Sequence, residues 1–211
     1  MSVRLSDRRV LLRLMLVIIA VAVGWGRAAT ASEITAPVEQ LHAGLISIMK
    51  AGKTASFRQR YETIAPVIGR TFDLEAILRQ VVGPRWRSLP ADQQAALADA
   101  FRRYTIASYV ANFDTYSGQR FETAPIVRAV GNDRVVETRI ATPGGREHAL
   151  DYVMRREGDG WKVVDVLAEG SISRVASQRS EMRSVLADGG GAELLVSLRQ
   201  KTAELSGGNF Q

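Results

Sequence analysis

Four alternating segments in the middle of the chain constrain its fold more than any other feature. Valine, isoleucine, tyrosine and threonine are enriched, largely in alternation with polar residues, in 121–130, 134–142, 147–156 and 161–168. The breaks between these segments are rich in turn residues: Gly131-Asn132-Asp133, Pro143-Gly144-Gly145 and Gly158-Asp159-Gly160. Because turns this short join antiparallel neighbours, the segments predict a four-stranded antiparallel meander.

Helical periodicity flanks this sheet on both sides. Apolar residues recur at helical spacing over 36–51, 56–68, 73–82, 90–112, 172–186 and 192–205. Asp73 is placed to cap the third helix, Gly83-Pro84 to end it, and Gly189-Gly190-Gly191 to separate the last two. The pattern predicts an α+β fold: a curved antiparallel sheet of about four strands, with helices from both ends of the chain packed on its concave face.

The first 31 residues have the three parts of a secretory signal. Several arginines precede an apolar run of ten residues at 14–23, and Ala29-Thr30-Ala31 supplies a small-x-small cleavage pattern. We expect cleavage after Ala31, which leaves 32–211 as a single domain outside the cytoplasm. A spanning helix needs about 20 apolar residues, so an uncleaved membrane anchor is the weaker alternative. An arginine pair at 8–9 leaves the export route, Sec or twin-arginine, open.

The charge balance argues against nucleic-acid binding. The whole chain has 28 basic and 22 acidic residues, but residues 1–31 hold five arginines and one aspartate. The remainder therefore has 23 basic and 21 acidic residues, a net charge of +2, and it has no basic tract. Cysteine is absent, which excludes disulfides, a thiol nucleophile and thiolate-bound metals.

Motifs of catalytic or cofactor chemistry are scarce. His42 and His148 have no partner at metal-ligand spacing, and no serine lies in a GxSxG elbow. The glycine triplet at 189–191 lies between helices, so it predicts a helix end and no dinucleotide loop. We therefore expect no metal, no cofactor and no enzymatic activity.

Two aspartates remain as candidates for acid–base catalysis. Asp151 and Asp165 lie inside predicted strands, and an acid on the inner face of an α+β cone could serve an isomerase or a hydratase. The alternative is that both lie on the outer face of the sheet, paired with arginines such as Arg139 or Arg155. Alternation with Leu150 supports the outer face for Asp151 and leaves Asp165 open.

Several short motifs resemble the MlaC family, also called the toluene-tolerance or phospholipid-transport auxiliary family. In the N-terminal half these are Phe72-Asp73, Val82-Gly83 with Trp86, Pro90, Phe101 and Tyr109. In the C-terminal half they are the run from Gly160-Trp161 to Asp165-Val166, then Glu169 to Ser173, Gln178 to Met182, and Leu194, Leu198 and Lys201. The run from Ser171 to Glu181 is most similar to the HpnM-like branch of hopanoid-making bacteria.

The resemblance implies a periplasmic lipid carrier, shaped like an NTF2-like cone, whose sheet and helices enclose an apolar pocket for acyl chains. It implies phospholipid or hopanoid as ligand. The implied partners are an inner-membrane MCE/ABC transporter or an RND-type exporter, and an outer-membrane lipoprotein complex. On this reading the candidate lipid-binding residues are the apolar positions Ile64, Ile68, Phe72, Ile77, Val81, Trp86, Leu97, Phe101, Tyr104, Tyr109, Val153, Val166 and Val175.

The physical cost of moving a lipid through water agrees with this expectation. Each buried methylene contributes about 0.8 kcal/mol, so two chains of roughly sixteen carbons would cost on the order of 25 kcal/mol to expose. A soluble carrier must enclose them and needs no catalytic group. Two alternatives stay open: an exported isomerase- or hydratase-like enzyme that uses Asp151 or Asp165, and an adaptor that only bridges membrane complexes.

Overall fold

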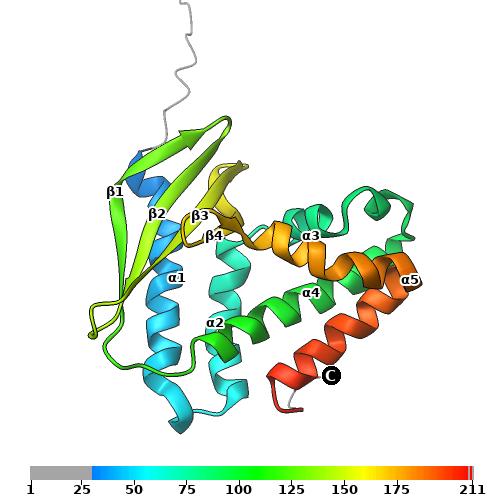
Figure 1. Ribbon diagram of the computed structural model, residues 1–211, viewed down its shortest axis with the longest axis horizontal. Coiled ribbons are helices and arrows are strands. Elements are labelled where there is room, and N and C mark those ends of the chain that lie inside the picture. The colour runs from blue at the N-terminus through cyan, green and yellow to red at the C-terminus, as the bar shows by residue number, and fades with distance from the viewer. Residues whose placement is uncertain (1–29, 209, 211) are drawn as a thin grey trace, which may run out of the picture.

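A computed structural model describes residues 30–208 and 210 of the 211-residue chain. The predicted signal lies outside the described residues except for Thr30 and Ala31. The helices are α1 (Ala31–Ala51), α2 (Phe57–Thr71), α3 (Leu74–Val82), α4 (Ala91–Asn112) and α5 (Arg174–Leu205), with short 3-10 turns η1 (Gly52–Thr54) and η2 (Gly83–Ser88). They lie behind one sheet and beside it (Figure 1). None of the helices described has both the length and the apolar character needed to cross a membrane.

The sheet is the predicted antiparallel meander with one strand added. Its order follows the sequence: β1 (Arg120–Val130), β2 (Asp133–Ala141), β3 (Glu147–Glu157), β4 (Gly160–Ala168) and β5 (Ile172–Ser173). Gly131 and Gly158 have a φ of 57° at the β1–β2 and β3–β4 turns, a conformation that glycine adopts at little cost. The four long strands are confirmed within a few residues, and β5 is too short for its alternation to have been visible.

Two irregularities in strand pairing curve the sheet. The register between β1 and β2 shifts between Thr123 and Val127, around Pro125, which has no N–H to donate. The register between β3 and β4 shifts between Val153 and Met154. Because an extra residue bends and twists the strand that carries it, these shifts wrap the sheet toward the helices.

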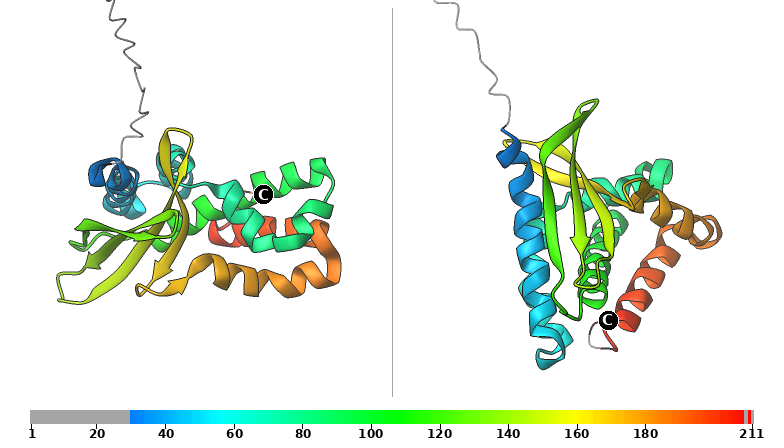
Figure 2. Two further views of the ribbon diagram at one scale, coloured as in Figure 1. Left: turned by 90° about the horizontal axis from the view of Figure 1, so that it is seen from above. Right: turned by 60° about the vertical axis from the view of Figure 1, so that its left-hand side comes forward.

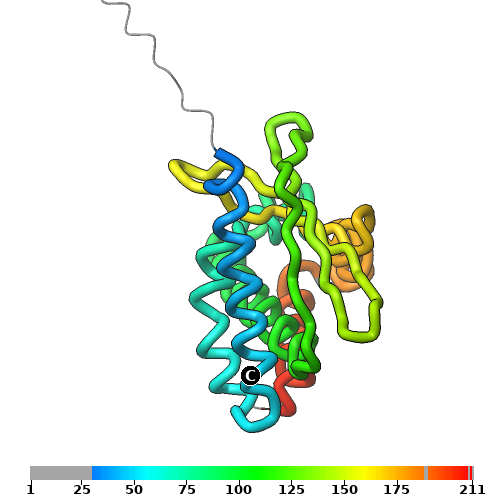
Figure 3. The backbone as a smooth tube through the Cα atoms, turned by 90° about the vertical axis from the view of Figure 1, so that its left-hand side faces the viewer, coloured from blue at the N-terminus to red at the C-terminus, as the bar shows by residue number. Residues whose placement is uncertain are grey.

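Helices α1 and α2 lie side by side and cover one face of the sheet (Figures 2 and 3). Val38, Leu41 and Leu45 of α1 are fully buried. The helix begins at Ala31 and not at the predicted residue 36, because Thr30 accepts from the Glu33 N–H while the Glu33 carboxylate accepts from the Thr30 N–H. The predicted cleavage site therefore falls in the first turn of α1.

The remaining helices form a second group beside the sheet, where α5 packs along α4 (Figures 1 and 2). The two predicted C-terminal helices are two arms of α5 that meet at Gly190, whose φ of 67° and ψ of −147° are not helical. A side chain at Gly191 would come within 2.6 Å of the Gln93 side-chain oxygen. The glycine run thus lets α5 turn back at the start of α4.

Candidate functional site

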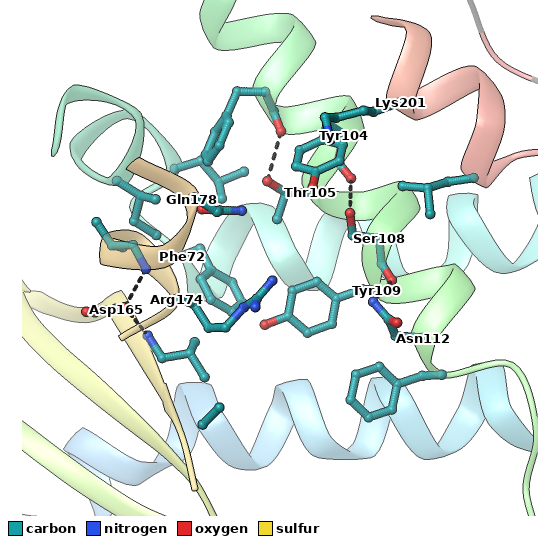
Figure 4. Close-up of a pocket in the computed structure, with 18 of the residues that line it drawn as sticks. Phe72, Tyr104, Thr105, Ser108, Tyr109, Asn112, Asp165, Arg174, Gln178 and Lys201 are labelled. Carbon is teal, nitrogen blue, oxygen red and sulfur yellow. Dashed lines mark hydrogen bonds between the residues drawn. The ribbon is translucent and has the colours of Figure 1, made fainter. Parts of the chain in front are cut away.

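A cavity of about 750 Å³ lies between α3, α4, the sheet and both arms of α5. Figure 4 shows α4 on one side of it and the start of α5, next to β4, on the other. The volume is within the range typical of sites for small organic ligands. The turn at Gly190 is what allows residues from the two ends of α5 to line the same cavity.

The floor of the cavity is apolar. Five of its lining side chains are at most 8% exposed: Phe72, Ile77, Phe101, Val166 and Val175. They come from the end of α2, from α3, α4, β4 and α5. An apolar group placed on this floor would be removed from water on nearly all sides.

The rim is polar and charged. Asn112, Arg174, Lys201 and Glu204 line the cavity and are exposed to solvent. An apolar floor below a charged rim suits an amphipathic ligand, because its apolar part is buried while its polar part stays hydrated.

The α4 wall is less polar than its sequence indicates. Thr105, Ser108 and Asn112 all line the cavity, yet each side chain donates a hydrogen bond to a carbonyl one turn earlier on α4, at 2.8, 2.9 and 2.8 Å. Their donors are thereby satisfied within the helix. From Phe101 to Asn112 this wall is roughly 17 Å long at 1.5 Å per residue.

Asp165 joins the sheet to α5. One carboxylate oxygen accepts from the Val166 and Val175 N–H groups at 2.7 and 3.1 Å, and the other accepts from the Ser173 hydroxyl. Ser173 in turn caps α5 by accepting from the Ala176 N–H at 2.9 Å. Two of the motifs shared with the MlaC family, the run ending at Asp165-Val166 and the run ending at Ser173, therefore meet at this junction.

Tyr109 and Arg174 both line the cavity, and the Arg174 side chain points toward the hydroxyl end of Tyr109 (Figure 4). Burial raises the pKa of Tyr109, and the positive charge of Arg174 offsets part of that rise. The phenol is therefore protonated at neutral pH and has a hydrogen to donate.

A buried polar pair lies behind the cavity wall. The His42 Nε2 atom is 3.2 Å from the Tyr152 hydroxyl, and the imidazole stacks on Phe121 with ring centroids 4.2 Å apart. Phe121 also contacts Phe113, which lines the cavity. Burial lowers the pKa of His42 to about 4, so the ring is neutral at pH 7.

The structure divides the thirteen candidate lipid-binding residues into two groups. Seven line the cavity: Phe72, Ile77, Phe101, Tyr104, Tyr109, Val166 and Val175. Six do not: Ile64, Ile68, Val81, Trp86, Leu97 and Val153. Ile64, Ile68 and Leu97 are fully buried in the core between helices and sheet, whereas Trp86 and Val153 are half-buried.

The two arms of α5 supply lining residues that apolar periodicity does not identify. Lys201, Glu204 and Leu205 come from the distal arm, and Arg174 and Gln178 come from the first. Four of the five are polar, so a search for apolar positions passes over them. The signal that could have found them is the glycine run at 189–191, interpreted as a reversal of direction that brings the two arms together.

Asp151 was predicted to pair with an arginine on the outer face of the sheet, and this pairing was wrong. The side chain is 7% exposed and accepts a 3.1 Å hydrogen bond from the Thr138 N–H. The expected arginines pair elsewhere: Arg139 with Glu122 and Arg155 with Asp133. Burial raises the pKa of Asp151, while the Thr138 hydrogen bond opposes that rise. Asp151 does not line the cavity.

Within the described residues, no three histidine, aspartate or glutamate side chains gather closely enough to hold a metal ion. His148 is exposed and lies 3.0 Å from Glu169 on the surface. His42 is buried, and its Nε2 atom contacts Tyr152.

We expect Asp165→Asn to lower the free energy of unfolding by about 1–2 kcal/mol, because the new amide cannot accept from both the helix start and the Ser173 hydroxyl. Chemical denaturation at pH 7 measures this change. Asp159→Asn, in the exposed β3–β4 turn, is the matched control and should leave stability unchanged. An Asp165→Asn protein as stable as the unmodified chain would contradict the structural role.

Fold and cavity together define an α+β protein with a cavity whose apolar floor and charged rim suit an amphipathic ligand. The model of the MlaC protein family matches residues 39–200, so this chain belongs to the MlaC family. A phospholipid-binding protein from Ralstonia solanacearum, solved in complex with a phospholipid, has a similar structure with a TM-score of 0.71. The two are 21% identical, and the match covers 82% of this chain and 99% of the other. No curated protein sequence matches the chain.

Proposed function

We propose that this protein is a periplasmic lipid carrier that binds phospholipid in the cavity described above. The observation that carries the proposal is the apolar floor beneath a charged rim, formed by residues such as Phe101 and Val175 below Arg174 and Lys201. Membership of the MlaC family supports it, as does the structural similarity to a protein that was solved with phospholipid bound.

A carrier must shield the acyl chains of its lipid from water, because exposing them is costly in free energy. At about 0.8 kcal/mol per methylene, burying even ten methylenes of an acyl chain contributes about 8 kcal/mol. A cavity of about 750 Å³ gives room for such burial while the rim leaves a headgroup in contact with water. The charged rim gives the ligand one orientation, with chains inward.

The proposal also covers transport of the lipid between membranes and the protein complexes that take part in it. MlaC proteins are periplasmic, and the signal-like segment of residues 1–31 agrees with export of this chain. We infer shuttling between an outer-membrane lipoprotein complex and an inner-membrane MCE/ABC transporter. The similarity of 171–181 to the HpnM-like branch supports an RND-type exporter and a hopanoid-type lipid as the alternative partner and cargo.

The geometry of Asp165 argues against the enzyme alternative. It is the only one of the two candidate acids that lines the cavity, and both of its oxygens accept hydrogen bonds from the start of α5 or from β4. A general base needs a free acceptor aimed at its substrate. We therefore assign Asp165 a structural role.

Mass spectrometry of organic extracts tests the proposal directly. Protein purified from its native periplasm without added detergent should carry about one equivalent of phospholipid per cavity. Recovery of hopanoid in its place would assign the cargo to the alternative. An extract that contains no lipid, from a folded protein that also takes none from vesicles, would refute lipid carriage.

A further inference from the structure

A guanidinium and a phenol hydroxyl face each other in the cavity, and neither donates a hydrogen bond to any of the described residues. Arg174, the first residue of α5, points toward the hydroxyl end of Tyr109 on α4 (Figure 4). In the described part of the chain, neither side chain has a hydrogen bond or an ion pair, although the Arg174 charge acts on Tyr109. Two donors therefore converge where the floor meets the rim.

The carboxylates near Arg174 are engaged elsewhere. Asp165 accepts from three donors at the β4–α5 junction. Glu204 accepts from the Gln200 amide at 2.9 Å. Among the described residues no carboxylate forms an ion pair with Arg174, and its planar fork of N–H donors matches two oxygens of a phosphate. Tyr109 adds a third donor from the opposite side.

We propose that Arg174 and Tyr109 together hold the phosphodiester of a phospholipid headgroup, while its acyl chains lie on the floor. This inference rests on the proposed function, since it takes a lipid in the cavity as given. It selects among the lipid classes that the function leaves open: the phosphodiester of a phospholipid accepts from both donors, whereas a lipid without a phosphate gives the Arg174 charge no counter-ion.

A pair of ligands that differ only in the phosphoglycerol headgroup tests the assignment. Lipid-free protein is titrated with a fluorescent phosphatidylglycerol and with a diacylglycerol that carries the same chains and dye. The unmodified protein should bind the phosphatidylglycerol about tenfold more tightly, as one to two charge-assisted hydrogen bonds predict. Arg174→Gln should abolish this preference by weakening phosphatidylglycerol binding about tenfold. Tyr109→Phe should reduce it several-fold.

The matched control is Arg183→Gln, which removes an exposed arginine from the same arm of α5 outside the cavity and should retain the full preference. Arg174→Lys should give an intermediate preference, because the charge remains but the fork is lost. A thermal unfolding curve like that of the unmodified protein shows that Arg174→Gln is folded.

The outcomes separate the two proposals. A protein that binds neither ligand refutes lipid carriage itself. A protein that binds both equally, or an Arg174→Gln variant that keeps the preference, overturns the phosphate assignment while lipid carriage stands. Inorganic phosphate is the third arm: if it stabilises lipid-free protein against heat as strongly as phosphatidylglycerol does, and only when Arg174 is present, the site binds free anions and the headgroup assignment is overturned.

Discussion

Ser108→Trp should weaken lipid binding by at least about tenfold and so reduce the lipid recovered with the purified protein. Ser108 projects from the middle of the α4 wall into the cavity, where an indole would occupy space that acyl chains need (Figure 4). Excluding only two methylenes costs about 1.6 kcal/mol, which is already more than a factor of ten in affinity. The measurement is the ratio of lipid to protein by mass spectrometry after purification from the periplasm.

The fold should survive this change, because the Ser108 hydroxyl bonds only to the Tyr104 carbonyl of its own helix. Ser108→Ala removes that hydroxyl without filling the cavity and should keep its lipid. Ala95→Trp puts the same indole on the exposed face of α4 and should keep it too. A folded Ser108→Trp protein with a full complement of lipid would show that the ligand lies elsewhere.

The sheet was predictable because its information is local. Alternation fixes which side chains share a face, and turn residues such as Gly131 and Gly158 fix where each strand reverses. The curvature was not predictable, since the register shift at Val153 and Met154 depends on how two strands settle against the helices. The first turn of α1 was missed because Thr30, its cap, had been assigned to the signal.

The cavity was only partly predictable for a different reason. Apolar periodicity identifies residues that leave water, and it gives the same signal for a solid core and for a cavity wall. Ile64 and Phe101 have similar patterns and similar burial, yet only Phe101 lines the cavity. The difference depends on where α5 lies, and its path depends on a backbone turn at Gly190 that no side chain encodes.

The charged residues of the rim were even less predictable from the sequence than the apolar residues of the floor. Arg174 and Lys201 lie at opposite ends of α5 and meet at one cavity only because the helix reverses between them. Neither belongs to a run of basic residues, so charge patterning gives no hint of a shared site. A residue that acts at a rim is selected by geometry, and the sequence alone leaves it among ordinary surface cations.

Acidification below pH 6.5 should destabilise the protein through His42. Burial lowers its pKa from 6.5 to about 4, so the folded state holds the neutral ring over a range where the unfolded state takes up a proton. The stability that this contributes is fully present above pH 6.5 and is lost as the pH falls toward 4. A difference of this size corresponds to about 3 kcal/mol. Urea unfolding across this pH range measures the loss.

Replacing both His42 and Tyr152 isolates the contribution of His42 to the acid sensitivity. The double variant His42→Phe, Tyr152→Phe removes both polar groups at once, so that no buried hydroxyl is left without its partner. Between pH 6.5 and 4, the double variant should lose about 3 kcal/mol less free energy of unfolding than the unmodified protein does. Tyr152→Phe alone keeps the buried imidazole and should keep the acid sensitivity, and His148→Asn, on the surface, should not alter it. A double variant as acid-sensitive as the unmodified protein would assign the effect to carboxylates. Because His42 reaches the cavity wall through Phe121 and Phe113, a confirmed effect would also predict that lipid retention weakens over the same pH range.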